Sequence, residues 1–186
     1  REALAASQAD LIGLARPFLA DPDWVHKTEA GDEEANLLCA ACHQGCLAQL
    51  RMGRGTGCAF NPETGHETDV ELAPAPQPRQ VMVVGGGPGG LEAARVAAKR
   101  GHRVTLYEQE DRLGGQLHSA AMPPHKEGFL DIIRHQELMA RRAGVEIRLN
   151  TTVTAEMVTT LRPDVVILAT GGIPLRVPFP GLEETD

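Results

Sequence analysis

Residues 81–108 read VMVVGGGPGGLEAARVAAKRGHRVTLYE, and the order of apolar runs, glycines and alanines in this segment predicts the fold. A continuous apolar run, typical of a strand buried on both faces, leads through a glycine-rich turn into a helix predicted over 89–100 and a second strand over 104–107. The alternation continues with a helix over 125–143, a strand over 145–149, a helix over 155–161 and a strand over 164–169. This β-α-β order predicts an α/β fold, with a Rossmann-like parallel sheet covered on both sides.

The glycine-rich turn matches the dinucleotide-binding pattern G-x-G-x-x-G at Gly85, Gly87 and Gly90. The first glycine permits a tight turn, the second lets the backbone approach a pyrophosphate, and the third allows close helix–strand packing. The N-terminus of the following helix offers free N–H groups to the phosphates. Glu108, 23 residues beyond Gly85, ends the second strand, where an acid can accept hydrogen bonds from an adenosine ribose. The motif alone is weak, but its position between a strand and a helix predicts a dinucleotide site.

Two further runs extend this pattern: RLGGQL over 112–117, with a second glycine pair, and ATG over 169–171 at the end of a predicted strand. Together with the first motif they resemble the two-dinucleotide, glutathione-reductase-like flavoproteins, from residue 80 to about Gly181. The resemblance implies that this unit binds FAD. It also implies FAD contacts at Gly89, Gln116, Lys126 and Val153.

The cysteines are confined to one short segment, where Cys39, Cys42, Cys46 and Cys58 have the spacing C-x2-C-x3-C-x11-C. Four thiolates on a compact loop can ligate a 4Fe–4S cluster or one Zn²⁺. Zinc sites commonly use two C-x2-C knuckles, which favours iron–sulfur here. Two alternatives stay open: a c-type haem on the sequence C-x-x-C-H, which leaves two cysteines unexplained, and a pair of local disulfides. The clustering of the cysteines indicates a reducing, cytoplasmic compartment.

The rest of the chain divides by composition. Residues 1–30 predict an alanine-rich helix over 2–9 and a short apolar strand over 10–15, and residues 31–72 are polar and turn-rich. Residues 73–79 carry proline at every second position from 74 to 78, which predicts a stiff, extended linker and a domain boundary.

The order of these features resembles one family. DLIGLARPF over 10–18, the cysteine set, the proline-rich linker and the glycine motif are similar to the multidomain old-yellow-enzyme family, which includes 2,4-dienoyl-CoA reductase and trimethylamine dehydrogenase. Its members have an FMN-binding TIM barrel, a 4Fe–4S loop and an FAD/NAD(P) module. The resemblance implies four parts: the C-terminal remnant of the barrel (1–30), the cluster loop (31–72), the FAD-binding half-domain (80–181) and the start of an NAD(P) domain (182–186).

The same resemblance implies an electron path from NAD(P)H through FAD and the 4Fe–4S cluster to FMN, which would reduce an activated C=C bond of an enoyl- or dienoyl-CoA-like substrate. Phosphate sites of TIM barrels lie at the ends of late strands, so Arg16 would pair with the FMN phosphate beside the Ala15 backbone. The acid and base of the substrate reaction would lie in the absent part of the barrel, so we expect this segment alone to be inactive. Two alternatives are an amine dehydrogenase of the same family with ADP in the Rossmann unit, and a zinc-stapled nucleotide-binding module without redox activity.

Composition excludes other classes. A net charge of −7 argues against nucleic-acid binding, and one Trp, one Tyr and four Phe make a base-stacking platform improbable. No apolar run approaches the roughly 20 residues of a membrane helix. We therefore expect the partners to be a small-molecule substrate and the remainder of the same polypeptide. The composition is also compatible with a homo-oligomer.

Overall fold

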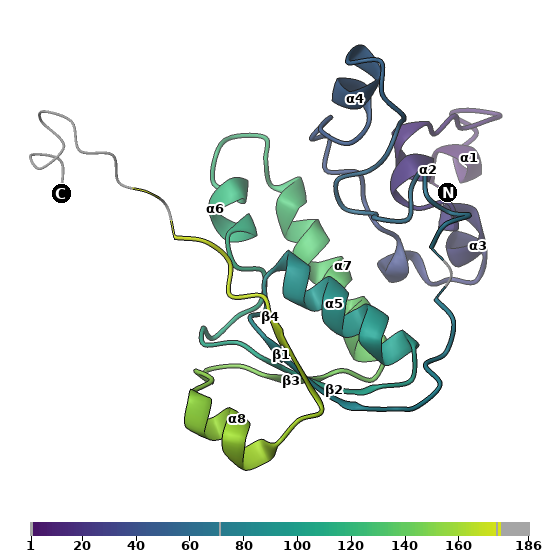
Figure 1. Ribbon diagram of the computed structural model, residues 1–186. Coiled ribbons are helices and arrows are strands. Elements are labelled where there is room, and N and C mark those ends of the chain that lie inside the picture. Colours follow the sequence, from purple (N-terminus) through teal and green to yellow (C-terminus); the bar gives the residue numbers. More distant parts are fainter. Residues whose placement is uncertain (1, 71, 174, 176–186) are drawn as a thin grey trace, which may run out of the picture.

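The structure, a computed structural model, describes residues 2–70, 72–173 and 175. An N-terminal part of short helices packs beside a sheet flanked by longer helices (Figure 1). Gly181 and the predicted start of a further domain at 182–186 lie outside the described residues. The N-terminal part contains α1 (Glu2–Ala5), α2 (Arg16–Ala20), α3 (Trp24–Glu29), the 3-10 helix η1 (Glu33–Ala35) and α4 (Leu47–Arg51).

The sheet has four parallel strands in the order β3-β2-β1-β4. In its register Val81 pairs with Val104 on one side and with Val165 on the other, so the apolar side chains of three strands share one face. The predicted α/β fold with a parallel sheet is confirmed. The strands are β1 (Gln80–Val84), β2 (Arg103–Tyr107), β3 (Glu146–Arg148) and β4 (Val165–Leu168).

Helices α5 (Pro88–Lys99) and α7 (Gly128–Arg142) cover one face of the sheet, and α8 (Ala155–Leu161) lies on the other side (Figure 1). The short helix α6 (Leu117–Ala121) precedes α7. Leu91 of α5, with Val83 and Leu106 of the sheet, is fully buried in the core between these layers. Burying a side chain of this size contributes about 1.5–3 kcal/mol, so this layer fixes α5, and with it the glycine turn, against β1.

The outer face of the sheet is less covered than the sequence predicts. Met82 is buried on it, but Leu168 at the end of β4 is 76% exposed. β4 is an edge strand of the described sheet, and α8 does not reach across its end (Figure 1). The prediction that both faces of the sheet are covered is therefore confirmed for the central strands. Within the described residues it is wrong for β4.

Two predictions near the N-terminus are wrong. Residues 10–15 form no strand, because no described strand lies beside them to accept their backbone hydrogen bonds, and Leu11 is 89% exposed. The helix predicted over 2–9 ends at Ala5. Two residues later Ser7 has a positive φ of 53°, which is incompatible with a continued right-handed helix. Further along, α7 begins at Gly128 rather than at residue 125, because His125 also has a positive φ, 65°.

His135 of α7 faces a cavity of about 160 Å³ between α5, α7 and the N-terminal part. Its Nδ1 is buried without a hydrogen-bond partner. Burial, and next the charge of Lys27, lower the pKa of His135 to about 4 from an ordinary value of 6.5. The imidazole is therefore neutral in the folded protein near pH 7.

This histidine predicts a pH dependence of stability. Since the pKa is lower in the folded state, its contribution is complete above pH 6.5 and is lost progressively as the pH falls towards 4, where the unfolded chain binds a proton that the folded chain does not. We expect the free energy of unfolding of His135→Gln to fall less steeply than that of the wild type as the pH decreases from 7 to 5. The variant lacks the proton, up to one per chain, that His135 takes up on unfolding in this range. Thermal unfolding at several pH values measures it. His66→Gln, at an exposed histidine, is the control, and an unchanged pH slope in His135→Gln would contradict the assignment.

Candidate functional site

The glycine turn between β1 and α5 has no room for side chains at two positions. Gly85 has a φ of +108°, and a Cβ there would lie 2.3 Å from the carbonyl oxygen of Ala169. A Cβ at Gly90 would lie 1.9 Å from the carbonyl oxygen of Gly85. The first glycine therefore permits the turn, and the third brings α5 against the end of β1, as the motif requires.

At Gly87 and Gly89 the surroundings are open. A Cβ at either residue would meet no heavy atom within 4 Å. Gly87 caps α5 without a side-chain hydrogen bond, so the first-turn N–H groups and the positive end of the helix face this space. Such a cradle fits the pyrophosphate of a dinucleotide.

Glu108 lies over the same turn at the end of β2. Its carboxylate is buried and accepts hydrogen bonds from the N–H of Gly86 at 2.6 Å and from the N–H of Glu110 at 3.0 Å. These two bonds fix the carboxylate beside the glycines. Because a carboxylate offers about four acceptor sites, it keeps capacity for the hydroxyl groups of a ribose.

The second glycine pair folds onto the first. Gly114 donates its N–H to the carbonyl of Gly86 at 2.9 Å. The exposed Gln116 donates from Nε2 to the carbonyl of Gly172 at 2.7 Å, just beyond β4. The structure thus brings three segments, predicted separately from sequence, to the carboxyl ends of the central strands, where open α/β sheets bind their ligands.

The two remaining predicted FAD contacts lie on other loops of the sheet domain. Lys126 is exposed, and its ammonium lies 6.0 Å from the centre of the Phe129 ring. Val153 is half-buried in the loop before α8. Contact of either residue with FAD stays a prediction.

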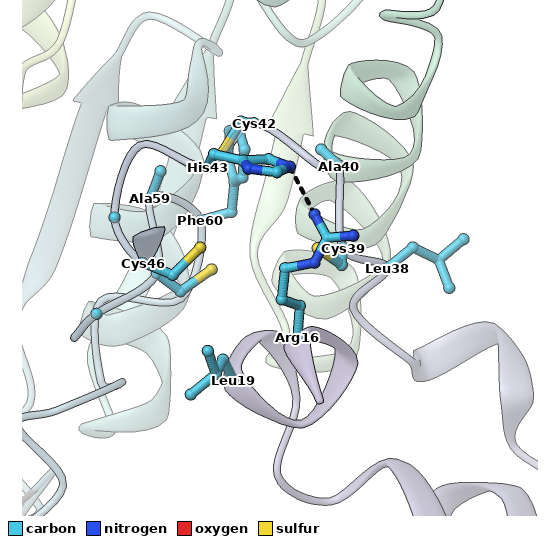
Figure 2. Close-up of a pocket in the computed structure, with 13 residues that line it drawn as sticks. Arg16, Leu19, Leu38, Cys39, Ala40, Cys42, His43, Cys46, Ala59 and Phe60 are labelled. Atoms are coloured by element: carbon cyan, nitrogen blue, oxygen red, sulfur yellow. Dashed lines mark hydrogen bonds between the residues drawn. The ribbon is translucent and has the colours of Figure 1, made fainter. Parts of the chain in front are cut away.

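The four cysteines line one cavity with their thiols free and half-buried (Figure 2). In the described part of the chain, no three or more Cys, His, Asp or Glu side chains are arranged so that they could hold a metal ion, so the thiols line the cavity without forming a metal-binding geometry. Among the described residues no carboxylate lines the cavity, and besides the thiols the one further side chain there that can ligate a metal is the imidazole of His43. Four soft sulfur donors without oxygen donors fit an iron–sulfur cluster and fit zinc, and exclude a hard cation such as Mg²⁺.

Gly45 brings the two halves of the cysteine loop together across the eleven-residue gap. Its carbonyl accepts the N–H of Gly57 at 2.8 Å, and a Cβ on Gly45 would lie 2.6 Å from the nitrogen of Ala59 and 2.9 Å from Cα of Cys58. This contact sets Cys46, the next residue, beside Cys58. The sequence does not predict this contact, because a single glycine in a polar loop carries no periodic signal.

We expect Gly45→Ala to destabilise the cysteine loop by about 1–3 kcal/mol and to lower the amount of metal retained after purification. The added methyl group would push the segment that contains Cys58 and Ala59 away from Gly45. Metal analysis of the purified variant measures the effect. Gly55→Ala adds the same methyl group to the same loop where nothing lies within 4 Å, and serves as the control. Equal metal content in both variants would contradict the role of Gly45.

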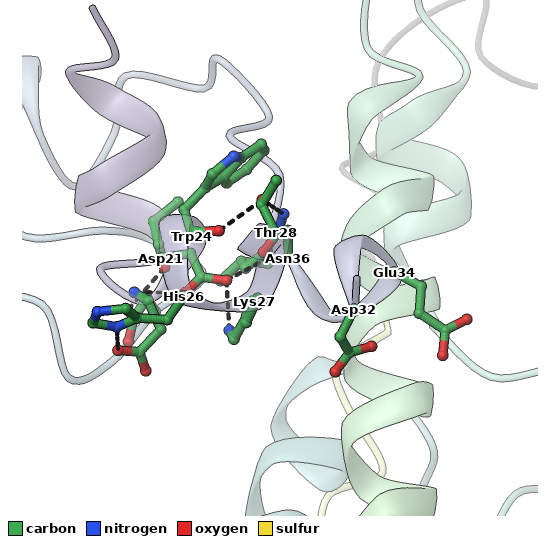
Figure 3. A network of polar contacts seen from close by, with 12 residues as sticks. Asp21, Trp24, His26, Lys27, Thr28, Asp32, Glu34 and Asn36 are labelled. Atoms are coloured by element: carbon green, nitrogen blue, oxygen red, sulfur yellow. Dashed lines mark hydrogen bonds and ion pairs between the residues drawn. The ribbon is translucent and has the colours of Figure 1, made fainter. Parts of the chain in front are cut away.

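A polar network holds the N-terminal part that carries this loop (Figure 3). The buried carboxylate of Asp21 accepts hydrogen bonds from Lys27 Nζ at 2.6 Å and from the N–H of Leu37 at 2.8 Å. Leu37 lies two residues before the first cysteine. The start of the loop is thereby fixed to α3.

Arginines of α7 join this part to the sheet domain. Arg142 donates to both carboxylate oxygens of Asp32, at 2.6 and 2.8 Å, and its guanidinium lowers the pKa of Asp32 below the ordinary value. Arg134 donates to the carbonyl of Glu34 at 2.8 Å. Charge-assisted, forked bonds of this kind fix orientation, so the cysteine loop is held at a defined place against α7.

The loop and the nucleotide unit meet at the start of α7. The rings of Phe60 and Phe129 pack edge to face with centroids 5.5 Å apart. A Cβ on Gly128 would lie 3.3 Å from Cα of Ala40, which stands between the first two cysteines. The sequence predicts both sites but not this contact, since nothing in the local pattern links residues 40 and 128.

Ala15 and Arg16 differ in position from the expectation. Ala15 is the N-terminal cap of α2 and Arg16 its first residue, because the predicted strand before them is absent. The guanidinium of Arg16 lies at the cysteine cavity, where Nη1 is 2.7 Å from His43 Nε2 (Figure 2). Pairing of Arg16 with an FMN phosphate stays a prediction.

Known proteins share this arrangement. The chain is 40% identical over 187 residues to N,N-dimethylglycine/sarcosine dehydrogenase of Chromohalobacter salexigens, a match covering 97% of the chain and 27% of that enzyme. It is 36% identical over 185 residues to the multifunctional alkene reductase/demethylase OYE of Caballeronia cordobensis, covering 98% and 27%. The crystal structure of a 2-naphthoyl-CoA reductase complex superposes with a TM-score of 0.93 at 35% identity, covering 99% of the chain and 28% of that protein.

The chain therefore spans just over a quarter of the length of these relatives. Within residues 2–70, 72–173 and 175, no helix has both the length and the apolar character that a bilayer span demands.

The relatives named above confirm the resemblance to the multidomain old-yellow-enzyme family. Residues 79–186, more than half of the chain, match the family described as "Pyridine nucleotide-disulphide oxidoreductase". The chain belongs to this oxidoreductase family, and the relatives named above match it over both the region of the cysteine loop and the nucleotide-binding unit.

Proposed function

We propose that this chain is the 4Fe–4S and FAD-binding portion of an NAD(P)H-dependent flavin oxidoreductase that reduces an activated C=C bond, as in an enoyl- or dienoyl-CoA-like substrate. One observation carries the proposal: a cavity lined by four free thiols lies directly against the nucleotide unit, through Phe60 and Phe129. Two relatives support the substrate class by their names, an alkene reductase and a reductase of an aromatic acyl-CoA.

Each part of the site has a role in this proposal. The four thiolates hold the cluster, which when bound would carry single electrons between FAD and FMN along the path from NAD(P)H. Gly85, Gly87 and Gly90 shape the turn that receives the FAD pyrophosphate, and Glu108 orients the ribose. The packing of Phe60 on Phe129 joins the cysteine loop to the nucleotide unit.

Other parts of the proposed enzyme lie outside this chain. FMN, whose phosphate Arg16 and Ala15 would contact, the NAD(P)H site and the acid and base of the substrate reaction belong to the remainder of the polypeptide. The 186 residues alone should then show no NAD(P)H-dependent reduction of an enoyl substrate. Four unpaired thiols favour a reducing, cytoplasmic compartment for the enzyme.

Metal and nucleotide analysis of anaerobically purified protein tests the proposal. We expect iron and acid-labile sulfide in equal amounts, and FAD among the nucleotides released on denaturation. Zinc without iron or sulfide would overturn the redox role and leave a zinc-stapled nucleotide-binding module.

An amine dehydrogenase is the second candidate, because a relative at 40% identity is named N,N-dimethylglycine/sarcosine dehydrogenase. In this case we expect ADP instead of FAD in the nucleotide unit. The two candidates give the same metal content, so the released nucleotide distinguishes them.

A further inference from the structure

Two separate hydrophobic clusters form the interior of the protein. The sheet cluster is built on the buried side chains of β1, β2 and the helices that cover them, with Val83 at its centre. The loop cluster consists of Ala20, Leu37 and the fully buried Ile132. In the part of the chain that the structure describes, Leu117 is the one side chain that packs against both clusters.

On the side of the loop cluster, Leu117 shares its neighbours with the cysteines. Cys39 and Cys58 pack against this same cluster, and so does Phe60. Every side chain in this contact is apolar or a thiol. The loop cluster is therefore a continuous apolar contact between Leu117 and two of the four residues that would hold the iron–sulfur cluster.

On its other side, Leu117 belongs to the turn of the second glycine pair. It directly follows Gln116, a predicted FAD contact, and its N–H donates to the carbonyl of Gly114 at 3.1 Å. This turn lies against the first glycine motif, since a Cβ on Gly115 would lie 3.3 Å from Cα of Gly87. The backbone of Leu117 thus continues directly from the cradle that would receive FAD.

A histidine fixes the start of α6 in this position. Nε2 of His118 lies 2.7 Å from the carbonyl oxygen of Leu113, and the ring donates this bond because a carbonyl can only accept. Leu113 is itself a buried member of the sheet cluster. The first turn of α6, which carries Leu117, is therefore tied to the segment before the glycine pair.

We propose that Leu117 is the bridge through which electrons pass between the flavin of the nucleotide unit and the iron–sulfur cluster, an inference that rests on the proposed function. In this step one electron leaves the anionic reduced flavin, which becomes neutral, and enters the oxidised cluster. No bond forms or breaks, and neither a proton nor a further reactant is required. Electron transfer weakens with distance, and it weakens more steeply across an empty gap than through packed atoms. Leu117 is then a positioning residue that keeps this path filled.

The aromatic pair is the competing route between the two sites. Phe60 and Phe129 also join the cysteine loop to the nucleotide unit, with ring centroids 5.5 Å apart. Their contact leads from the loop into α7, whereas Leu117 is covalently next to the residues that would receive FAD. The structure therefore favours Leu117 as the bridge.

A temperature jump on the full-length protein, held at a potential where flavins and cluster are partly reduced, measures the exchange of electrons without a hydride step. We expect two relaxations, one for each flavin, and protein depleted of FMN identifies the one that belongs to FAD. Leu117→Ala leaves a gap and should slow the FAD relaxation several-fold while the FMN relaxation keeps its rate. Leu117→Met nearly keeps the volume and should transfer at close to the wild-type rate. Leu138→Ala, at a half-buried leucine of α7 outside both clusters, is the matched control.

FAD, iron and sulfide contents and the reduction potentials are measured in the same samples, so that a lost cofactor or a changed driving force is recognised. A wild-type protein without FAD, iron and sulfide would sink the proposed function itself. A fully loaded Leu117→Ala whose FAD relaxation slows no more than that of Leu138→Ala would overturn the inference alone. So would a slower FAD relaxation in Phe60→Leu together with an unchanged one in Leu117→Ala. If Leu117→Ala does not retain FAD, Leu117→Val opens a smaller gap and is judged by the same outcomes.

Discussion

Cys42→Ser should purify without iron or acid-labile sulfide and should become sensitive to protease within residues 31–70. A serine hydroxyl is a hard donor that does not replace a thiolate on iron, so the centre loses a ligand. The loop has little else to hold it. The buried apolar side chains of residues 31–70 are those of Ala35 and Leu37. Cys39 and Cys58 themselves pack against the small hydrophobic cluster around Leu37. Because metal binding and folding of such loops are coupled, loss of the centre should loosen the whole segment.

Metal analysis and limited proteolysis with mass spectrometry measure the two effects. Ala59→Ser is the control, since it adds a hydroxyl to the same cavity and removes no thiol. Full iron content together with wild-type protease resistance in Cys42→Ser would show that this cysteine is not a ligand.

The sheet domain could be predicted closely from the sequence because its signals are local. The apolar run before Gly85 became β1, and the helix predicted over 155–161 is α8 with the same bounds. The glycine pattern fixes backbone conformation residue by residue, so the φ of Gly85 and the closeness of Gly90 follow from it. The helix predicted over 125–143 is α7, which begins at Gly128 and ends at Arg142.

The N-terminal part could not be predicted in the same way, since its arrangement depends on contacts distant in sequence. An apolar run such as residues 10–15 is a strand only where another strand accepts its hydrogen bonds. The contact of Arg16 with His43 and that of Gly128 with Ala40 join segments that no local pattern relates. The cysteine spacing predicted which residues gather, and the structure adds that they gather against the start of α7.

Gly90→Ala should have the second large effect, on both stability and FAD content. The added Cβ would lie 1.9 Å from the carbonyl oxygen of Gly85 and 3.3 Å from Cβ of Ala169. The first of these is a backbone atom in the tightest part of the turn, so no side-chain rotation relieves the contact. α5 must move away from β1, which opens the layer around the fully buried Leu91. We expect a loss of about 3 kcal/mol in the free energy of unfolding, at the upper end of overpacking effects.

The same movement displaces the first turn of α5 from the cradle at Gly87, so FAD retained after gel filtration should fall at least tenfold. Denaturant unfolding and nucleotide release measure the two losses. Gly55→Ala adds a methyl group outside the nucleotide unit, where nothing lies within 4 Å, and should leave both quantities near wild type. If Gly90→Ala unfolded at the same denaturant concentration as Gly55→Ala, helix and strand would not be in the close contact that the glycine motif requires.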